Sequence, residues 1–491
     1  MAALPEYVYD AAQVREIERI AVAQHGVSEI ALMQRAGAVA WNVLQRHWPD
    51  AKHIAVLAGG GNNAGDGYVV AELARAAGCQ VTVCSVTDPA RLKHAAADAR
   101  ERYLQKGGVE QAFNDGLPDN PDVIVDALLG TGLDRPLTGT MSEAVTYMNG
   151  ALRPVLALDI PSGLHADSGA AMGAAVNASV TVTFIAVKPG LLTGAGPRCC
   201  GELLFDDLGV PSDWTGPVSP RARRLGAADF SLHRRPRDAH KGLSGHVLIV
   251  GGDHGMGGAV RLAAEAALRA GAGLVSVATR AEHVPALIAG LPEAMPRAVE
   301  HADDLDALLA RAAVVAIGPG LGQGAWSRAL YGRAVEAGLP LVVDADALNL
   351  LAATPKRRPD WVLTPHPGEA ARLLGSDTAT VQSDRFQALD ALLESYHGTV
   401  VLKGAGTLVG AHDELPAICD RGNPGMAAPG MGDALTGLIA AFAAQGLPLP
   451  DAARAGVWVH AVAGDRAALR GERGMLARDL IAELRGLVNT P

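Results

Sequence analysis

The chain has 491 residues, of which 49% are hydrophobic and 19% charged, and it contains 58 glycines and 29 prolines. This composition excludes collagen and general disorder, and the length predicts two domains rather than one core. The net charge of -10 and the aromatic content of 4% argue against a nucleic-acid partner, which needs basic tracts or stacking platforms.

The first half of the chain alternates short apolar runs with amphipathic helical segments, as βαβ units do. Two helices, at residues 10–24 and 28–46, precede the first strand at 53–58. The expected later elements are helices at 68–77, 92–105 and 142–149 and strands at 80–86, 122–127, 154–159 and 178–186. This alternation predicts a parallel sheet covered by helices on both faces.

The periodic pattern stops over residues 208–240, where Pro, Arg, Ser and Asp dominate, and we place a linker at 216–239. Beyond it, the expected strands lie at 246–250, 274–278, 313–317, 341–343, 361–363 and 397–402, with helices at 257–270 and 434–444. The sequence therefore predicts two α/β domains, at residues 1–215 and 240–491.

A glycine-rich segment, GGGNNAGDG at residues 59–67, lies between an apolar strand and a helix. Backbone N–H groups and the helix dipole favour an anion there, and we expect a pyrophosphate. A plain turn capped by Asp66 would explain the glycines and the aspartate, but not the two asparagines. The segment departs from GxGxxG, so it does not indicate ordinary NAD redox chemistry.

Two further strands of the first half end in aspartates, Asp126 in DALLGTGL and Asp159 in DIPSG. Carboxyl ends of parallel strands meet at one edge of a sheet, so these residues should lie near the glycine-rich segment. Asn63, Asp126 and Ser162 would offer only hard oxygen ligands, which suit an alkali or alkaline-earth cation. A loop-capping role explains each aspartate equally well by itself.

In this order, GGGNNAGDG, DALLGTGL, LDIPSGL and VKPGLLTGAG resemble the NAD(P)H-hydrate epimerase domain over nearly all of residues 1–215. The resemblance implies a Rossmann-like αβα fold that interconverts the R and S hydrates of NADH and NADPH. It implies K⁺ on Asn63, Asp126 and Ser162, and Asp159 as the catalytic acid or base. The implied substrate contacts are Asn62, Asn63, Ala64, Gly65, Asp66, Gly130, Thr131, Gly132, Leu133, Asp134, Arg135, Pro136 and Asp159.

Lys188 and Ala64 also lie within the segments that carry this resemblance. Lys188 is a second catalytic candidate, and the alternative is that it only pairs with a carboxylate on the rim of the site. Ala64 stands where the family usually has glycine, which reduces the conformational freedom of the backbone.

The second half contains GNPGMAAPGMGD, residues 422–433, directly before an apolar helix. The glycines open an anion site at the helix start, where Asp433 is placed to accept the proton of an alcohol during phosphoryl transfer. A helix-capping role explains Asp433 alone, but not the glycines and Asn423 before it. The segment is typical of GxGD alcohol kinases.

Other polar segments follow strands at the same predicted edge. KGAGT, residues 403–407, offers a cation, flexible backbone and a hydroxyl for a nucleotide. TPHPGE places His366 at a strand end, which favours a ligand role over that of a solvated surface histidine. GPGLG at 318–322 and Asp344 to Asp346 close two more strands, so one cleft can use all of these segments.

With GGDHGMGGA at 251–259 and LRAGAGL at 268–274, these segments resemble the nucleotide-dependent NAD(P)H-hydrate dehydratase domain over roughly residues 230–491. The resemblance implies a ribokinase-like αβα fold that dehydrates the S hydrate with Mg²⁺ and ADP as phosphoryl donor. It implies Asp433 as the catalytic base and hydrate contacts at Ala259, Gly320, His366 and Asp433. The implied nucleotide contacts are Lys403, Gly404, Ala405, Gly406, Thr407 and Gly432.

The two resemblances together predict a bifunctional enzyme that repairs hydrated NADH and NADPH. The GxGD segment alone also permits a small-alcohol kinase, for a hydroxymethylpyrimidine-like substrate, fused to a non-catalytic dinucleotide-binding module. TPHPGE and NNAGDG favour a dinucleotide substrate instead.

We expect a cytoplasmic protein without a membrane passage. The longest apolar stretches, such as residues 438–444, are too short to span a bilayer, and the charged N-terminus lacks the apolar region of a signal peptide. The five cysteines are odd in number and form no CxxC pair, which fits a reducing compartment. The Leu- and Ala-rich N-terminal helices suggest a homo-oligomer.

Overall fold

The computed structural model describes residues 3–116, 120–211, 216, 218–229, 232, 236–238 and 240–489. The chain divides into two compact units, residues 1–223 and 224–491, and the division falls within the expected linker. Within the described residues, no helix is long and apolar enough to cross a membrane.

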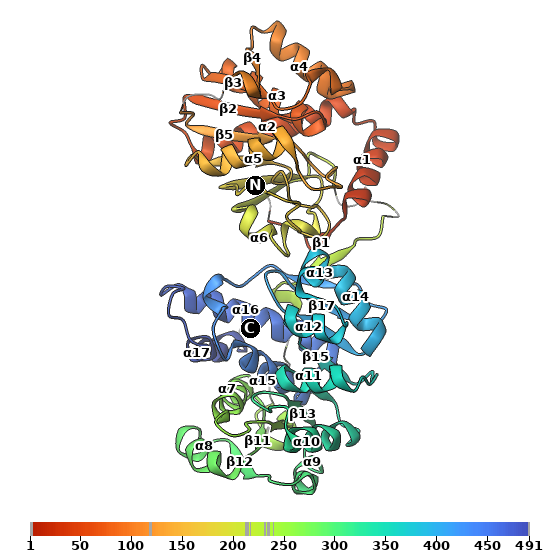
Figure 1. Cartoon of the computed structure of the whole chain (residues 1–491), viewed down its shortest axis with the longest axis vertical. Helices are drawn as coiled ribbons and strands as arrows, with labels where there is room; N and C mark the ends of the chain where they lie inside the picture. The colour runs from red at the N-terminus through yellow and green to blue at the C-terminus, as the bar shows by residue number, and fades with distance from the viewer. Residues whose placement is uncertain are drawn as a thin grey trace. The chain divides into compact units, whose positions relative to one another are not determined.

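The first unit is a parallel sheet between two helical layers (Figure 1). The strand order is β4–β3–β2–β5–β6–β7–β8, and every neighbouring pair is parallel. This is the Rossmann order with one strand added, with the switch point between β2 and β5. The strands are β2 (His53–Ala58), β3 (Gln80–Ser85), β4 (Glu110–Ala112), β5 (Val123–Ala127), β6 (Val155–Leu158), β7 (Val180–Phe184) and β8 (Glu202–Asp206).

The alternating side chains of β2 explain the two layers. Ile54 and Val56 belong to the core beneath α2, α3 and α4, whereas Ala55 and Leu57 belong to the core beneath α5. The helices of this unit are α1 (Ala11–His25), α2 (Glu29–His47), α3 (Asn62–Ala76), α4 (His94–Gln105), α5 (Gly139–Gly150) and α6 (Gly196–Cys199). In a short antiparallel pair, β1 (Tyr7–Val8) lies against Ala222 and Arg223 of β9 (Ala222–Arg224).

The prediction of a loop through residue 67 is wrong, because helix α3 begins at Asn62 instead of at residue 68. Gly61 is the extended N-cap residue, so only three glycines connect β2 to α3. A Cβ on Gly59 would lie 1.9 Å from the Leu128 carbonyl oxygen, so glycine allows the chain to turn against the loop after β5.

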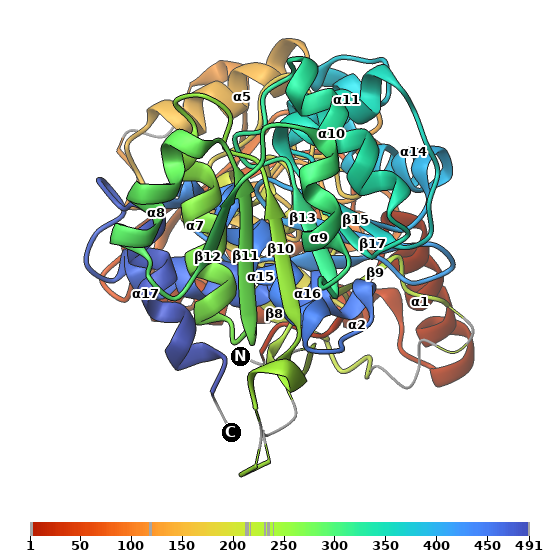
Figure 2. The same ribbon diagram turned by 90° about the horizontal axis from the view of Figure 1, so that it is seen from below.

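The second unit has a larger sheet whose strands run in the order β18–β17–β16–β15–β14–β13–β10–β11–β12. β17 is antiparallel to both neighbours, and the strands from β16 to β12 are parallel. Figure 2 shows β12, β11 and β10 side by side, near α7 and α8. The strands are β10 (His246–Val250), β11 (Leu274–Thr279), β12 (Met295–Ala298), β13 (Val314–Ile317), β14 (Leu341–Val343), β15 (Trp361–Leu363), β16 (Thr399–Leu402), β17 (Thr407–Ala411) and β18 (Ala417–Cys419).

Helices cover both faces of this second sheet. α7, α15, α16 and α17 pack over one apolar core, whereas α10 and α14 contact strands from the opposite face. The helices are α7 (Gly257–Arg269), α8 (Val284–Gly290), α9 (Asp306–Leu309), α10 (Ala325–Glu336), α11 (Ala345–Ala353), α12 (Pro367–Leu373), α13 (Thr378–Ser383), α14 (Arg385–Tyr396), α15 (Met431–Ala444), α16 (Leu449–Ala468) and α17 (Ala477–Leu487). Two three-layer αβα units are therefore confirmed.

The predicted start of the apolar helix at residue 434 is three residues late. Gly430 adopts a left-handed conformation with φ of +85°, and α15 begins at Met431. Gly432 and Asp433 therefore lie in the first helical turn, with Asp433 at its third residue.

Candidate active sites

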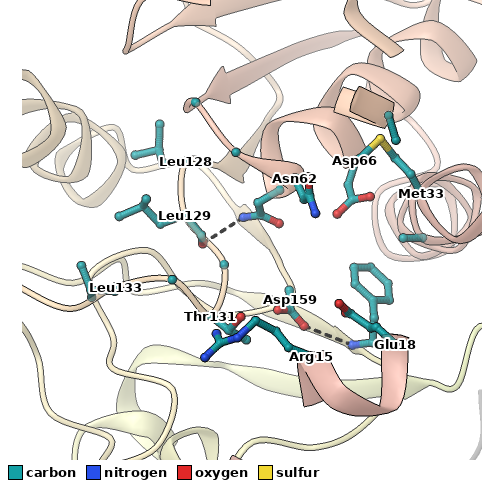
Figure 3. Close-up of a pocket in the computed structure, with 18 of the residues that line it drawn as sticks. Arg15, Glu18, Met33, Asn62, Asp66, Leu128, Leu129, Thr131, Leu133 and Asp159 are labelled. Carbon is teal, nitrogen blue, oxygen red and sulfur yellow. Dashed lines mark hydrogen bonds between the residues drawn. The ribbon is translucent and has the colours of Figure 1, made fainter. Parts of the chain in front are cut away.

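A cavity of about 980 Å³ opens at the carboxyl edge of the first sheet (Figure 3). Its wall includes residues of helices α1 and α2, the start of α3 and the loops after β3, β5 and β6. The predicted residues that line it are Asn62, Asn63, Asp66, Gly130, Thr131, Gly132, Leu133, Asp134, Arg135, Pro136 and Asp159. Ala64 and Gly65 are not among the lining residues, because α3 turns them into the core, where Ala64 is fully buried.

Asp159 lies at the end of β6 in a left-handed conformation, with φ of +65°. Its Oδ1 accepts hydrogen bonds from the Phe184 backbone N–H and the Thr183 hydroxyl, both at 3.3 Å, and from Lys188 Nζ. Backbone strain of this kind persists only where surrounding contacts hold it, as they do here. The carboxylate is therefore held rigidly at the cavity wall.

Lys188 is 1% exposed, so it lies beneath the site and not on its rim. Besides Asp159, its Nζ donates to the Thr183 hydroxyl at 3.1 Å and to the Phe184 carbonyl at 3.0 Å. The ion pair foreseen as the alternative for Lys188 is present, but it is buried. Lys188 thus positions Asp159.

Replacing Lys188 by Met should lower the free energy of unfolding by about 3 kcal/mol, because it leaves a largely buried carboxylate unpaired. Urea denaturation followed by circular dichroism measures the change. The matched control is Lys106→Met, which removes an exposed ion pair with Glu72 in the same unit and should cost less than about 1 kcal/mol. Equal effects of the two substitutions would contradict the positioning role.

Glu18 and Asp66 are two of the other carboxyl groups that line the same cavity. Burial raises the pKa of Asp66 well above its usual value, and the neighbouring charges of Asp159 and Glu18 raise it further, whereas Lys188 opposes the shift. Burial likewise raises the pKa of Glu18. Figure 3 shows Glu18 and Arg15 extending from α1 near Asp159, with Asp66 on the far side. The cavity therefore brings Asp159 together with Asp66, a carboxyl group whose pKa is raised, and this arrangement is suited to proton transfer.

Three predicted cation ligands cluster behind this wall. Asp126 is fully buried and accepts hydrogen bonds from the Ser162 N–H at 2.8 Å and the Ser162 hydroxyl at 2.6 Å. Burial raises the pKa of Asp126 to about 6. Asn63 Nδ2 donates to the Leu129 carbonyl at 2.9 Å, and the Ser162 hydroxyl also lies 3.4 Å from that oxygen. The Asn63 Oδ1 atom is buried with no hydrogen-bond partner among the described residues, so it is free to bind a cation.

In the second unit, a buried charge network lies at the carboxyl ends of β14, β15 and β16. Lys403 Nζ lies 2.7 Å from Asp344 Oδ1 and 3.8 Å from Glu369 Oε2. The Thr436 hydroxyl on α15 donates to the other Asp344 oxygen at 2.7 Å. A Cβ on Gly432 would lie 3.4 Å from Lys403 Nζ, so the start of α15 meets this network.

Asp433 lies in the same region, within the first turn of α15. It is not the N-cap residue, which is Gly430, so the capping interpretation of Asp433 is wrong. Burial raises the pKa of Asp433 to about 6, and the Asp344 charge contributes to the rise while Lys403 opposes it. A carboxyl group with this pKa is a suitable general base near neutral pH.

The other predicted residues of this unit occupy neighbouring loops. A Cβ on Gly320 would lie 3.2 Å from Ala259 Cβ, so these two residues are adjacent. His366 caps α12, accepting hydrogen bonds from the Gly368 N–H at 3.0 Å and the Glu369 N–H at 3.4 Å, and its ring remains exposed. Gly404 and Ala405 are exposed, Gly406 is buried, and the Thr407 hydroxyl donates to the Gly404 carbonyl at 3.0 Å.

Each of the two units matches a known protein family. A family described as YjeF-related protein N-terminus matches residues 29–190, and one described as NAD(P)H-hydrate dehydratase matches residues 247–485. A bifunctional NAD(P)H-hydrate repair enzyme of Coxiella burnetii is 50% identical, over 98% of this chain and 99% of its own. The chain belongs to the family of bifunctional NAD(P)H-hydrate repair enzymes.

Another member of the repair-enzyme family, from Escherichia coli, is 47% identical over 99% of this chain and 95% of its own. The solved structure of a ribokinase-like superfamily protein from Enterococcus faecalis is 29% identical, with a TM-score of 0.50 over 53% of this chain and 93% of that chain. The ribokinase-like fold expected for the second unit is thereby confirmed.

Sequence reasoning about this repair-enzyme chain missed Arg15 and Glu18 in the first site and Thr436 in the second. Arg15 and Glu18 look like the solvated face of an amphipathic helix, so no local signal shows that α1 lies over the cavity. Asp344 is recognisable only as a polar strand end, and its pairing with Lys403 and Thr436 depends on three separate elements. Contacts between such distant segments can be recognised only once the tertiary structure is known.

Proposed function

We propose that the chain repairs hydrated NADH and NADPH through two activities. The first unit epimerises the R and S hydrates, and the second uses ADP to dehydrate the S hydrate to NAD(P)H, AMP and phosphate. We assign the epimerase to residues 1–215, the linker to 216–239 and the dehydratase to 240–491. The observation that carries the proposal is the presence of two acidic sites, around Asp159 and Asp433, in a chain that its relatives match from end to end.

In the epimerase, the cavity binds the hydrated dinucleotide with its pyrophosphate at the start of α3, where the helix dipole is favourable. The lone pair of the ring nitrogen assists loss of hydroxide from the neighbouring carbon. Asp159 exchanges the proton involved, while Asp66, whose pKa is raised by burial, donates a hydrogen bond to the substrate within the same cavity. Re-addition of water to the other face of the ring gives the second epimer.

The same proposal includes a potassium ion held by Asn63, Asp126 and Ser162. The unpartnered Asn63 Oδ1 and the buried Asp126 carboxyl group supply the hard oxygen donors that such a cation prefers. The ion would supply a fixed positive charge beside the loop of residues 130–136, which lines the cavity.

In the dehydratase, the hydroxyl group of the S hydrate attacks the terminal phosphoryl group of the nucleotide while Asp433 takes its proton. The start of α15 and Lys403 stabilise the transferring negative charge. Hydroxide is a poor leaving group, but the phosphorylated hydroxyl departs as phosphate. Loss of the adjacent ring proton then restores the double bond.

We propose that the nucleotide contacts Lys403, Gly404, Ala405, Gly406, Thr407 and Gly432, and that the hydrate contacts Ala259, Gly320, His366 and Asp433. Within the described residues, no group of three or more His, Cys, Asp or Glu side chains forms a metal centre. Magnesium commonly binds through substrate phosphates and one or two carboxylates, so the nucleotide itself would hold it. The ion would neutralise phosphate charge during transfer.

The alternative of a small-alcohol kinase fused to a non-catalytic module explains the GxGD segment but not the rest of the chain. Both units match repair enzymes over the full length, and the first unit has a cavity with a proton-transfer arrangement. We further propose that the enzyme acts in the cytoplasm as a homo-oligomer.

The epimerase half is tested by supplying the pure R hydrate without any nucleotide, so that dehydration cannot proceed. Chromatographic separation of the epimers should show S hydrate forming faster than in an enzyme-free control. Formation at the control rate would favour the non-catalytic module.

The dehydratase should lose activity in acid because its base must be ionised. Since the pKa of Asp433 is raised to about 6, kcat/KM for the S hydrate should fall about tenfold for each pH unit below this value. Initial rates of NADH formation, corrected for enzyme-free controls, give the profile, with excess magnesium keeping the nucleotide ionised. A flat profile down to about pH 5 would contradict the assignment of Asp433 as the base.

A further inference from the structure

A second polar group of residues lines the epimerase cavity on the side away from Asp159. Thr87 and Arg91 follow β3 and line the same cavity as Asp159, which follows β6. The sheet order places β2 and β5, with their loops, between these two strands. At the usual strand spacing, β3 and β6 are about 14 Å apart, so the two ends of the cavity can hold the two halves of a dinucleotide.

Both residues also flank the glycine-rich turn. A Cβ on Gly60 would lie 3.0 Å from the Thr87 hydroxyl oxygen and 3.5 Å from Arg91 Cβ. If the pyrophosphate lies at this turn and the reacting ring at Asp159, the adenosine ribose falls beside Thr87 and Arg91. This placement rests on the function proposed above for the first unit.

The polar groups of the Thr87 and Arg91 side chains are available to bind a ligand. Among the described residues, the buried Thr87 hydroxyl oxygen has no hydrogen-bond partner, and the exposed Arg91 makes no side-chain hydrogen bond or ion pair. Arg19, which also lines the cavity, is paired with Glu16 at 2.7 Å. Arg15 extends from α1 near Asp159, at the other end of the cavity (Figure 3), and Arg135 belongs to the loop after β5.

In dinucleotide-binding folds of this strand order, the segment after the second strand reads the adenosine ribose. An acidic residue there binds the free 2′-hydroxyl, whereas an arginine accommodates the 2′-phosphate. In this chain the acidic residue, Asp88, is engaged in accepting a hydrogen bond from the Ala90 N–H at 2.9 Å and does not line the large cavity. Arg91 does line it, and a guanidinium group is suited to bidentate contact with a phosphate.

We propose that Thr87 and Arg91 form a binding site for the adenosine 2′-phosphate, so that the epimerase acts on NADPH hydrate in preference to NADH hydrate. Both residues are specificity determinants that touch the substrate far from the reacting ring. Their contribution should therefore appear only with the phosphorylated dinucleotide.

The test compares epimerisation of the R hydrates of NADPH and NADH by the full-length protein, without nucleotide. Arg91→Ala should lower kcat/KM for NADPH hydrate about tenfold or more and leave that for NADH hydrate within about twofold. Arg91→Lys should retain part of the preference, and Thr87→Val should reduce it by a smaller factor. The difference between the two substrates should shrink as salt is added.

Lys93→Ala is the matched control, because Lys93 is an exposed cation two residues away that does not line the cavity. It should leave the preference unchanged. An unchanged substrate ratio in Arg91→Ala, or an equal loss on both substrates, would overturn the inference while leaving the epimerase activity established. If the unmodified protein converts neither hydrate, the proposed function fails, and this inference fails with it.

Discussion

Replacing Asp433 by Asn is expected to reduce nucleotide-dependent dehydration of the S hydrate by about 10²–10⁴-fold, the usual contribution of a general base. The amide keeps the size of the side chain but cannot accept the hydroxyl proton when phosphoryl transfer begins. Helix α15 should still form, because its N-cap residue is Gly430 and Asp433 makes no capping hydrogen bond. The rate of NADH formation from pure S hydrate with ADP and magnesium measures the loss.

Two controls separate this chemical role from a defect in folding. Epimerisation of the R hydrate by the Asp433→Asn protein should be unchanged, because it takes place in the first unit. Asp479 occupies the same third position of its helix, α17, where it accepts a hydrogen bond from the Leu476 N–H, and Asp479→Asn should retain dehydration. A near-normal rate of dehydration by the Asp433→Asn protein would contradict the assignment of Asp433 as the general base.

The second large effect is expected for Asp159→Asn, which should reduce epimerisation by about 10²–10⁴-fold and leave dehydration of the S hydrate intact. The asparagine can occupy the same left-handed backbone conformation, so the loop after β6 should keep its shape. Lys188 would lose the charge of its partner but retain its bonds to Thr183 and Phe184. Chromatography of the R and S epimers over time measures the rate.

Asp66→Asn provides an internal comparison within the same cavity. Burial raises the pKa of Asp66 well above its usual value and so favours the protonated form, which the neutral amide resembles in charge. Asp66→Asn should lower the rate of epimerisation by less than about tenfold, because the amide can still donate a hydrogen bond to the substrate. A loss as large as that of Asp159→Asn would instead indicate that both carboxyl groups transfer protons.

Much of the fold and the principal acidic residues could be predicted from the sequence. Asp126 and Asp159 end apolar strands, and strand ends of a parallel sheet meet at one edge whatever the details of packing. The two N-terminal helices lie within one residue of their expected bounds, and in the structure Asp10 and Ser28 both accept the capping hydrogen bond at the helix starts. These features depend on local chemistry and on general rules of sheet topology.

The remaining features depend on contacts between distant segments. The burial of Lys188, the position of α1 over the cavity and the Asp344–Lys403 pair each join elements far apart in the chain. The start of α15 depends on whether Gly430 adopts a left-handed conformation, which several other glycines in the same segment could also have done. Short strands such as β4 and β18 carry too few residues for a clear periodic signal.

The central claim is that one chain recovers both hydrate epimers, and a single assay tests it. The protein is mixed with magnesium and a known mixture of R and S NADH hydrates, separately with ADP, with ATP and without nucleotide, and the near-ultraviolet absorbance of NADH is followed. With nucleotide, recovery should exceed the S fraction and proceed faster than spontaneous epimerisation allows. Recovery that stops at the S fraction would contradict the epimerase, and no recovery with either nucleotide would contradict the repair function itself.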